Sequence, residues 1–115
     1  MEMMIATAYA EQKKATENND TLCDAFVAFV SEILMHDTDD TMEVSLLKGA
    51  WDDHERDFLG EWDNFVEFVM DYADNHFAID SGVMDYINWE DMANDWEMSY
   101  NIARTDDGTV YVWSA

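Results

Sequence analysis

Acidic side chains recur at helical spacing near the middle of the chain. Four of them follow one another at steps of four, four and three residues: Asp63, Glu67, Asp71 and Asp74. A helix rises about 1.5 Å per residue, so this row puts successive carboxylates about 5–6 Å apart on one helical face. Five further acids extend the series: Asp85, Glu90, Asp91, Asp95 and Glu97. Because such a row suits a protein groove lined with Lys and Arg, we predict that these nine residues contact a basic partner.

The chain is far more acidic than solubility requires. Its 115 residues include 27 Asp and Glu but only five Lys and Arg, a formal net charge of −22, whereas about 2–8 charges keep a small domain soluble. Residues 49–99 alone carry −14, with Arg56 as their single base. Duplex DNA carries one charge per about 1.7 Å of axis, so 22 charges match about 37 Å of duplex, and a compact chain of this length is about 35 Å across. A solvated acidic face is the simpler interpretation, but helical surfaces normally mix charges of both signs.

The composition excludes several classes of protein. Hydrophobic residues make up 49% of the chain and aromatic residues 14%, which argues against a disordered acidic tail. The negative charge argues against direct nucleic-acid binding and against an anionic membrane surface. No basic N-terminal region and no apolar run of membrane-spanning length is present, so the cytoplasm of the host cell is the expected location.

Motifs for catalysis or metal binding are not found in the sequence. The segment 37–41 begins like a calcium loop, but Met42 replaces the glycine at the sixth position and Lys48 the glutamate at the twelfth. The three histidines do not have zinc-site spacing, and Cys23 is the only cysteine and is expected to be buried. We therefore predict no enzymatic activity, no cofactor and no metal.

Hydrophobic periodicity predicts the elements that carry these residues. Helices are expected over 3–16, 22–36 and 41–48, with a strong one from Glu61 onward and another after Asn88. Asp107-Gly108 predicts a hairpin with a two-residue turn, placing Arg104 opposite Tyr111 and Ile102 opposite Trp113. Residues 83–87 are expected to supply any additional strand.

The expected fold class is therefore α+β, with four to five helices followed by a C-terminal β-hairpin or small antiparallel sheet. Residues 1–49 form a helical N-terminal segment and residues 50–115 an acidic α+β segment, together expected to make one compact domain.

Three stretches of the C-terminal half share a pattern with a known family: Phe65–Asp74, Tyr86–Trp96 and Gly108–Trp113. In these stretches the chain resembles the ArdA antirestriction proteins of plasmids and phages. The resemblance covers about residues 50–115 and has departures, with Asn88 where an acid is common and Asn94 where Arg is frequent. It implies an elongated, dimeric mimic of bent DNA that occupies the DNA groove of type I restriction enzymes.

These observations favour a DNA-mimic inhibitor of a DNA-binding host-defence enzyme, without direct contact to nucleic acid or membrane. Two alternatives stay open. In the first, the chain is an anti-CRISPR or immunity-type inhibitor that binds a basic protein site. In the second, it is a salt-adapted acidic protein of unrelated function. Five Trp are many for this length, so some are expected at an interface with a partner protein or with a second copy of the chain. Whether the chain forms a homodimer is left open.

Overall fold

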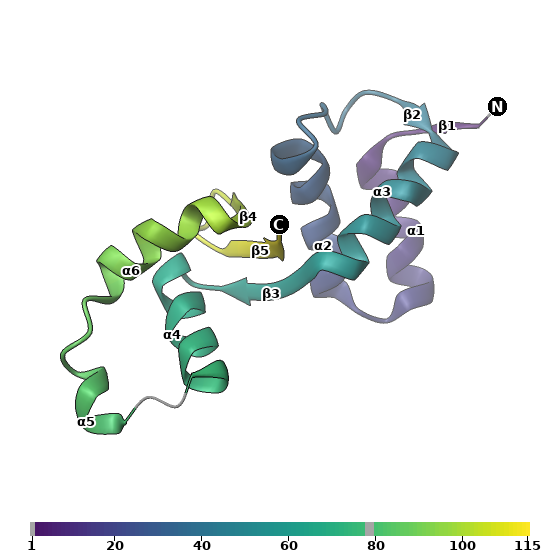
Figure 1. The fold of residues 1–115 in the computed structure, drawn as a ribbon. Coiled ribbons are helices and arrows are strands. Elements are labelled where there is room, and N and C mark those ends of the chain that lie inside the picture. Colours follow the sequence, from purple (N-terminus) through teal and green to yellow (C-terminus); the bar gives the residue numbers. More distant parts are fainter. Residues whose placement is uncertain (1, 78–79) are drawn as a thin grey trace.

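A computed structural model describes residues 2–77 and 80–115. Residues 2–57 form a helical lobe, the N-terminal lobe, at the right of Figure 1. Its elements are β1 (Met3–Met4), α1 (Ala6–Glu17), α2 (Asp20–Ala28), the π-helix η1 (Phe29–Ile33), β2 (Met42–Glu43) and α3 (Val44–Asp57). Phe26 of α2 packs against Tyr9 of α1 and Trp51 of α3, which closes the core of this lobe.

The remaining described residues form the C-terminal lobe, in which helices cover a small sheet. Its elements are β3 (Phe58–Trp62), α4 (Phe65–His76), α5 (Ser81–Met84), α6 (Trp89–Trp96), the 3-10 helix η2 (Glu97–Ser99), β4 (Tyr100–Arg104) and β5 (Val110–Ser114). The sheet is antiparallel, with strand order β3-β5-β4. The predicted α+β class is confirmed.

The central strand β5 joins the two lobes, because both of its faces are covered. Val110 and Val112 belong to the core that α4 and α6 build on one face of the sheet. Tyr111 and Trp113 belong to a second core, on the other face, with Phe29 of η1. A strand buried on both faces has to be apolar throughout, which explains the run of β-branched and aromatic residues at the C-terminal end.

A glycine at a bulge allows β3 to serve both cores. Phe58 pairs with Trp113 while Gly60 pairs with Val112, so β3 has one extra residue at this point. The bulge turns Phe58 toward η1 and Trp62 toward α4. Gly60 has φ of +143°, and a Cβ there would approach the Trp62 ring to 3.1 Å.

Gly60→Ala is therefore expected to lower the free energy of unfolding by about 1–3 kcal/mol, the typical size of such backbone strain. Gly49→Ala is the matched control, since a Cβ at Gly49, inside α3, meets nothing within 4 Å. That variant should gain up to about 1 kcal/mol from helix propensity. Urea unfolding of both variants measures the difference, and equal stabilities would contradict this account of β3.

Several predicted elements were wrong. Glu61 and Trp62 belong to strand β3, and α4 starts at Phe65 after the N-cap residue Asn64. The third strand of the sheet is β3 and not residues 83–87, which contribute to helix α5 and the turn after it. The helix predicted over 41–48 runs from Val44 to Asp57, so the expected segment boundary at 49/50 falls inside α3. Periodicity alone could not place the boundaries of β3, because its pairing with β5 decides where α3 ends and α4 begins.

The hairpin is confirmed, but its register differs from the predicted one by one residue. Arg104 pairs with Val110 and Ile102 with Val112. The Thr105 N–H donates to the Thr109 carbonyl over 2.9 Å, so three residues form the loop instead of two. The observed register puts Ile102 and Val112 on the α4–α6 face together, and burial on both faces of β5 therefore overrides the local turn preference.

The molecule is elongated, with extents of 58 × 25 × 24 Å and a radius of gyration of 16.3 Å. A compact chain of this length has a radius of gyration of about 13 Å, so the expected diameter of about 35 Å was too short. The N-terminal lobe and the helices of the C-terminal lobe lie at opposite ends, with the three-stranded sheet between them (Figure 1).

Candidate partner-binding surface

Helix α4 carries three of the four acids of the first predicted row on its outer face. The Asn64 side chain caps the helix by accepting the Glu67 N–H over 2.9 Å. The helix buries Phe65, Phe68, Val69 and Ala73, which leaves the opposite side for the acids. Glu67, Asp71 and Asp74 are exposed there, within about 60° of one another at 100° per residue. Asp63 is exposed in the bend that precedes α4, so the prediction that all four acids share one helical face was wrong for this residue, because α4 begins only after Asn64.

One member of this row also has a structural contact. The Trp62 indole N–H donates to the Asp71 carboxylate over 2.8 Å. This hydrogen bond ties the edge strand β3 to α4. The spacing of the acids did not indicate it, because it depends on how β3 packs against the helix.

Helix α6 divides its acids between two flanks. Trp89, Met92, Ala93 and Trp96 face the core. Glu90 and Glu97 lie on one flank and line a groove of about 530 Å³ between α4, α6 and the hairpin. Asp91 and Asp95 lie on the other flank by the 100° spacing, and Asp85 is exposed in the turn after α5. The nine predicted residues are all at the surface, but they do not form one continuous patch.

The groove beside α6 contains the one base of this lobe. Arg104 is the only Lys or Arg in the sequence after Arg56, and it forms an ion pair and hydrogen bond with Glu97. The charge of Glu97 is therefore partly offset in the free protein. Because Arg104 is the one base in a strongly acidic segment, the sequence could have predicted that it pairs with a nearby carboxylate.

Acidic charge covers both lobes once the chain is divided where the structure divides it. Residues 1–57 carry 14 acids and four bases, a net charge of −10, and residues 58–115 carry 13 acids and one base, a net charge of −12. The acidic residues of segment 49–99 are thus divided between the two lobes, because the part of this segment that lies in α3 belongs to the N-terminal lobe. The predicted surface occupies the C-terminal lobe only.

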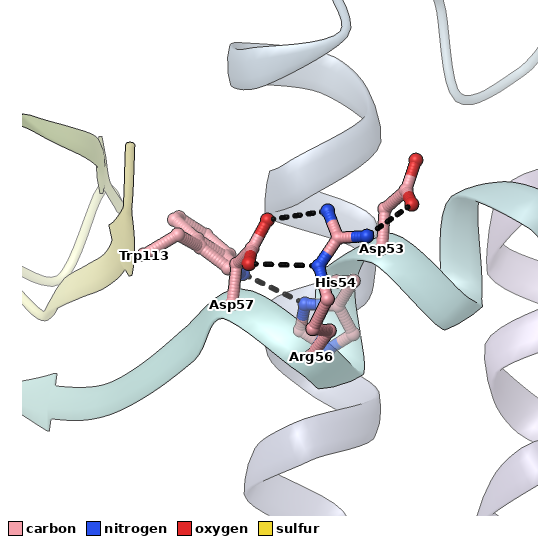
Figure 2. A network of polar contacts seen from close by, with 5 residues as sticks. All are labelled: Asp53, His54, Arg56, Asp57 and Trp113. Atoms are coloured by element: carbon pink, nitrogen blue, oxygen red, sulfur yellow. Dashed lines mark hydrogen bonds and ion pairs between the residues drawn. The ribbon is translucent and has the colours of Figure 1, made fainter.

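A buried histidine links the two lobes (Figure 2). His54 of α3 is fully buried. Its Nδ1 accepts the Trp113 indole N–H over 2.8 Å, and its Nε2 lies 2.8 Å from the Leu22 carbonyl oxygen. Both contacts are satisfied by a neutral ring with the proton on Nε2. Burial lowers the pKa of His54 to about 4, despite the opposing effect of the Leu22 carbonyl.

No motif surrounds His54, so residue patterns could not indicate this role. An exposed network lies beside it at the end of α3, where the Arg56 guanidinium donates two hydrogen bonds of 3.0 Å to Asp57 and pairs with Asp53 (Figure 2). The hydrogen bonds from Arg56 hold the pKa of Asp57 below its usual value.

The tryptophans divide between core and surface. Trp51 and Trp113 are buried in the cores and are not available to a partner. The other three, which pack against the C-terminal core, are partly exposed: Trp62, Trp89 and Trp96. Cys23 is buried as predicted, and its burial raises the pKa of the thiol.

Within residues 2–77 and 80–115, no group of three His, Cys, Asp or Glu side chains is placed to hold a metal ion. Segment 37–41, which begins like a calcium loop in sequence, forms an Asx turn in which Asp37 accepts the Asp39 N–H over 2.9 Å. Among the helices of this described part, none combines the length and apolarity needed to span a membrane.

The chain was compared with models of protein families, with curated proteins and with solved structures, and none of the three comparisons finds a match. The resemblance to the ArdA proteins therefore stays a prediction.

Proposed function

We propose that this protein is a DNA mimic that inhibits a DNA-binding host-defence enzyme by occupying its DNA groove. The observation that carries the proposal is the charge per unit length. A net charge of −22 over 58 Å is one charge per about 2.6 Å, against one per about 1.7 Å for duplex DNA. The free protein thus presents about two thirds of the axial charge density of a duplex of its own length.

The arrangement of the acids supports the proposal further. The outer face of α4 and both flanks of α6 are acidic, while the aromatic core between these helices and the sheet holds them in place. A duplex also presents its charge in separate rows around an apolar interior. Rows fixed on a packed scaffold lose little conformational freedom on binding, which favours affinity.

Competition with DNA tests this function. A purified type I restriction enzyme, the target that the ArdA resemblance implies, and a DNA-binding protein fraction from a bacterial lysate are passed over the immobilised protein. Retained protein is then eluted with a duplex of about 20 bp, which exceeds 58 Å at about 3.4 Å per base pair. We expect this duplex to elute the retained enzyme and polyglutamate of equal charge to be much less effective.

Equal elution by the two polymers would assign the binding to charge alone and favour an inhibitor of a basic site without duplex geometry. Retention of nothing at low salt from either source would refute the proposal. A fold that forms only at molar KCl would instead favour the salt-adapted alternative.

The affinity for the retained enzyme is expected to fall about tenfold or more between 50 and 200 mM NaCl, because exposed charges on both partners are screened. Fluorescence anisotropy of the labelled protein over this range measures the change. A binding constant independent of salt would contradict electrostatic mimicry.

A further inference from the structure

An apolar groove lies on the N-terminal lobe between the end of η1 and helix α3. Its volume is about 310 Å³, near the lower end of the usual range for binding pockets, about 300–1,000 Å³. Its walls are mainly aliphatic: Val30, Leu34, Met42, Leu46, Leu47 and Ala50. Leu46 is 63% exposed and Leu34 38%. Apolar residues gathered around a groove indicate an interaction site, unlike single exposed ones.

Gly49 also lines this groove, in the interior of α3. The free protein does not need glycine there, because a Cβ at this position meets nothing within 4 Å. Glycine inside a helix is about 1 kcal/mol less favourable than Ala. Its presence is explained if another chain approaches the helix closely at this turn, where a side chain would intervene.

The charge around the groove determines which chain fits. The loop from His36 to Met42 connects two lining residues and carries three exposed acids, Asp37, Asp39 and Asp40. Asp53 lines the groove from α3. Lys48 is about 200° around α3 from Leu46 and so faces away from it. A second copy would bring a second N-terminal lobe of net charge −10 against this one, whereas a basic segment would be attracted.

We propose that this groove binds a basic amphipathic helix of a partner protein. The aliphatic side chains of that helix fill the groove between η1 and α3, and its Lys or Arg residues face the Asp-bearing loop and Asp53. An apolar helix face laid into a groove is a common mode of peptide recognition. The proposal concerns the opposite lobe from the acidic rows of α4 and α6 and does not depend on DNA mimicry.

A synthetic peptide tests the groove directly. The probe is a fluorescently labelled peptide of Leu and Lys, about 18 residues long so that a helix can form, with Leu at helical spacing. A scrambled peptide of the same composition is its control. At about 150 mM NaCl, where surface attraction is screened beyond about 8 Å, we expect the amphipathic peptide to bind at least tenfold more tightly than the scrambled one.

Variants then locate the site. Gly49→Leu, which fills the groove from a helical position with open space, and Leu46→Ser, which removes an exposed apolar wall, should each weaken binding of the amphipathic peptide at least fivefold. Leu59→Ser is the matched control, since Leu59 is 43% exposed on β3 in the other lobe, and it should bind as the wild type does. Thermal unfolding of each variant confirms that the fold is kept.

Equal binding of the two peptides, or unchanged binding by both groove variants, would overturn the proposal. A dimer detected by light scattering that Leu46→Ser dissociates would overturn it as well, because the groove would then belong to a second copy of the chain. None of these outcomes bears on the DNA-competition test, so the two proposals can fail separately.

Discussion

Reversing the acidic row of α4 is expected to weaken binding to the DNA-binding target at least 100-fold. The variant carries Lys at positions 63, 67 and 74, and Asn at position 71. Asn is used there because its carbonyl oxygen still accepts the Trp62 indole N–H that Asp71 accepts in the wild type. The substitutions thus change the charge of the surface while they keep the contact between β3 and α4.

The magnitude follows from the cost of single exposed ion pairs. Each lost pair with a basic partner removes about 0.2–1 kcal/mol, and each new like-charge pair opposes binding by a similar amount. Three reversals and one neutralisation therefore amount to about 3 kcal/mol, and each 1.4 kcal/mol is about tenfold in the dissociation constant. Single Ala substitutions in the row should have mild effects, because the acids act together.

A control variant separates this surface from net charge. Glu32, Asp52 and Glu55 changed to Lys, with Glu2→Gln, alters the net charge equally and uses exposed residues of the N-terminal lobe. Anisotropy titrations with the restriction enzyme compare the two variants. Equal losses of affinity would contradict the assignment of the α4 row, and full inhibition by the folded α4 variant would show that the target binds elsewhere.

Acidification is expected to destabilise the fold through His54, by about 2 kcal/mol between pH 7 and pH 5. The pKa of His54 is lowered from 6.5 to about 4 in the folded state. Between these values the unfolded chain binds more protons than the folded one, so stability rises with pH in this window. The contribution is fully present above about pH 6.5 and is lost progressively as the pH falls toward 4, at about 1.36 kcal/mol per pH unit.

Protonation at Nδ1 has a direct structural consequence. The added proton would remove the acceptor of the Trp113 indole N–H, which is the hydrogen bond that joins α3 to β5. A buried donor without a partner costs about 1–3 kcal/mol. We therefore expect loss of the near-ultraviolet circular dichroism of the tryptophans to accompany acid unfolding.

Urea unfolding at pH 5 and pH 7 measures the free energy of unfolding of the wild type and of each variant. The His54 contribution is read as a difference between variants, because protonating the carboxylates of so acidic a chain relieves repulsion and stabilises the fold at low pH. His54→Gln should lose the His54 contribution to the pH dependence, while His36→Gln, at an exposed position, should keep it. If His54→Gln fails to fold, Trp113→Phe takes its place, and it should also reduce the pH dependence of the free energy of unfolding. The same pH dependence in wild type, His54→Gln and Trp113→Phe would contradict the linkage.

Local patterns were sufficient for most helices and for the hairpin. The apolar positions around Phe26 and Val30 repeat with a helical period, and their helix spans α2 and η1. Asn88 caps α6 by accepting the Asp91 N–H, as its position before the periodic run predicts. These features need only neighbours along the chain, which is why they could be predicted.

Long-range pairing decided what local patterns could not. Residues 58–62 have little strand character of their own and form a strand because β5 offers an edge to pair with. The hairpin register follows from burying both faces of β5, and the partners of His54 come from residues 32 positions before and 59 positions after it. No periodicity within a window of one helix or strand contains that information.

Residue types and their spacing were enough to predict the charge, the helical rows of carboxylates and the α+β class, because these depend on residue identity and on periodicity within one element. The packing of separate elements set the 58 Å length of the molecule, the hydrogen bond from Trp113 to His54 and the apolar groove beside Gly49. Each of these brings together residues far apart in the chain, whose contacts depend on which faces of the helices and of the buried strand β5 meet.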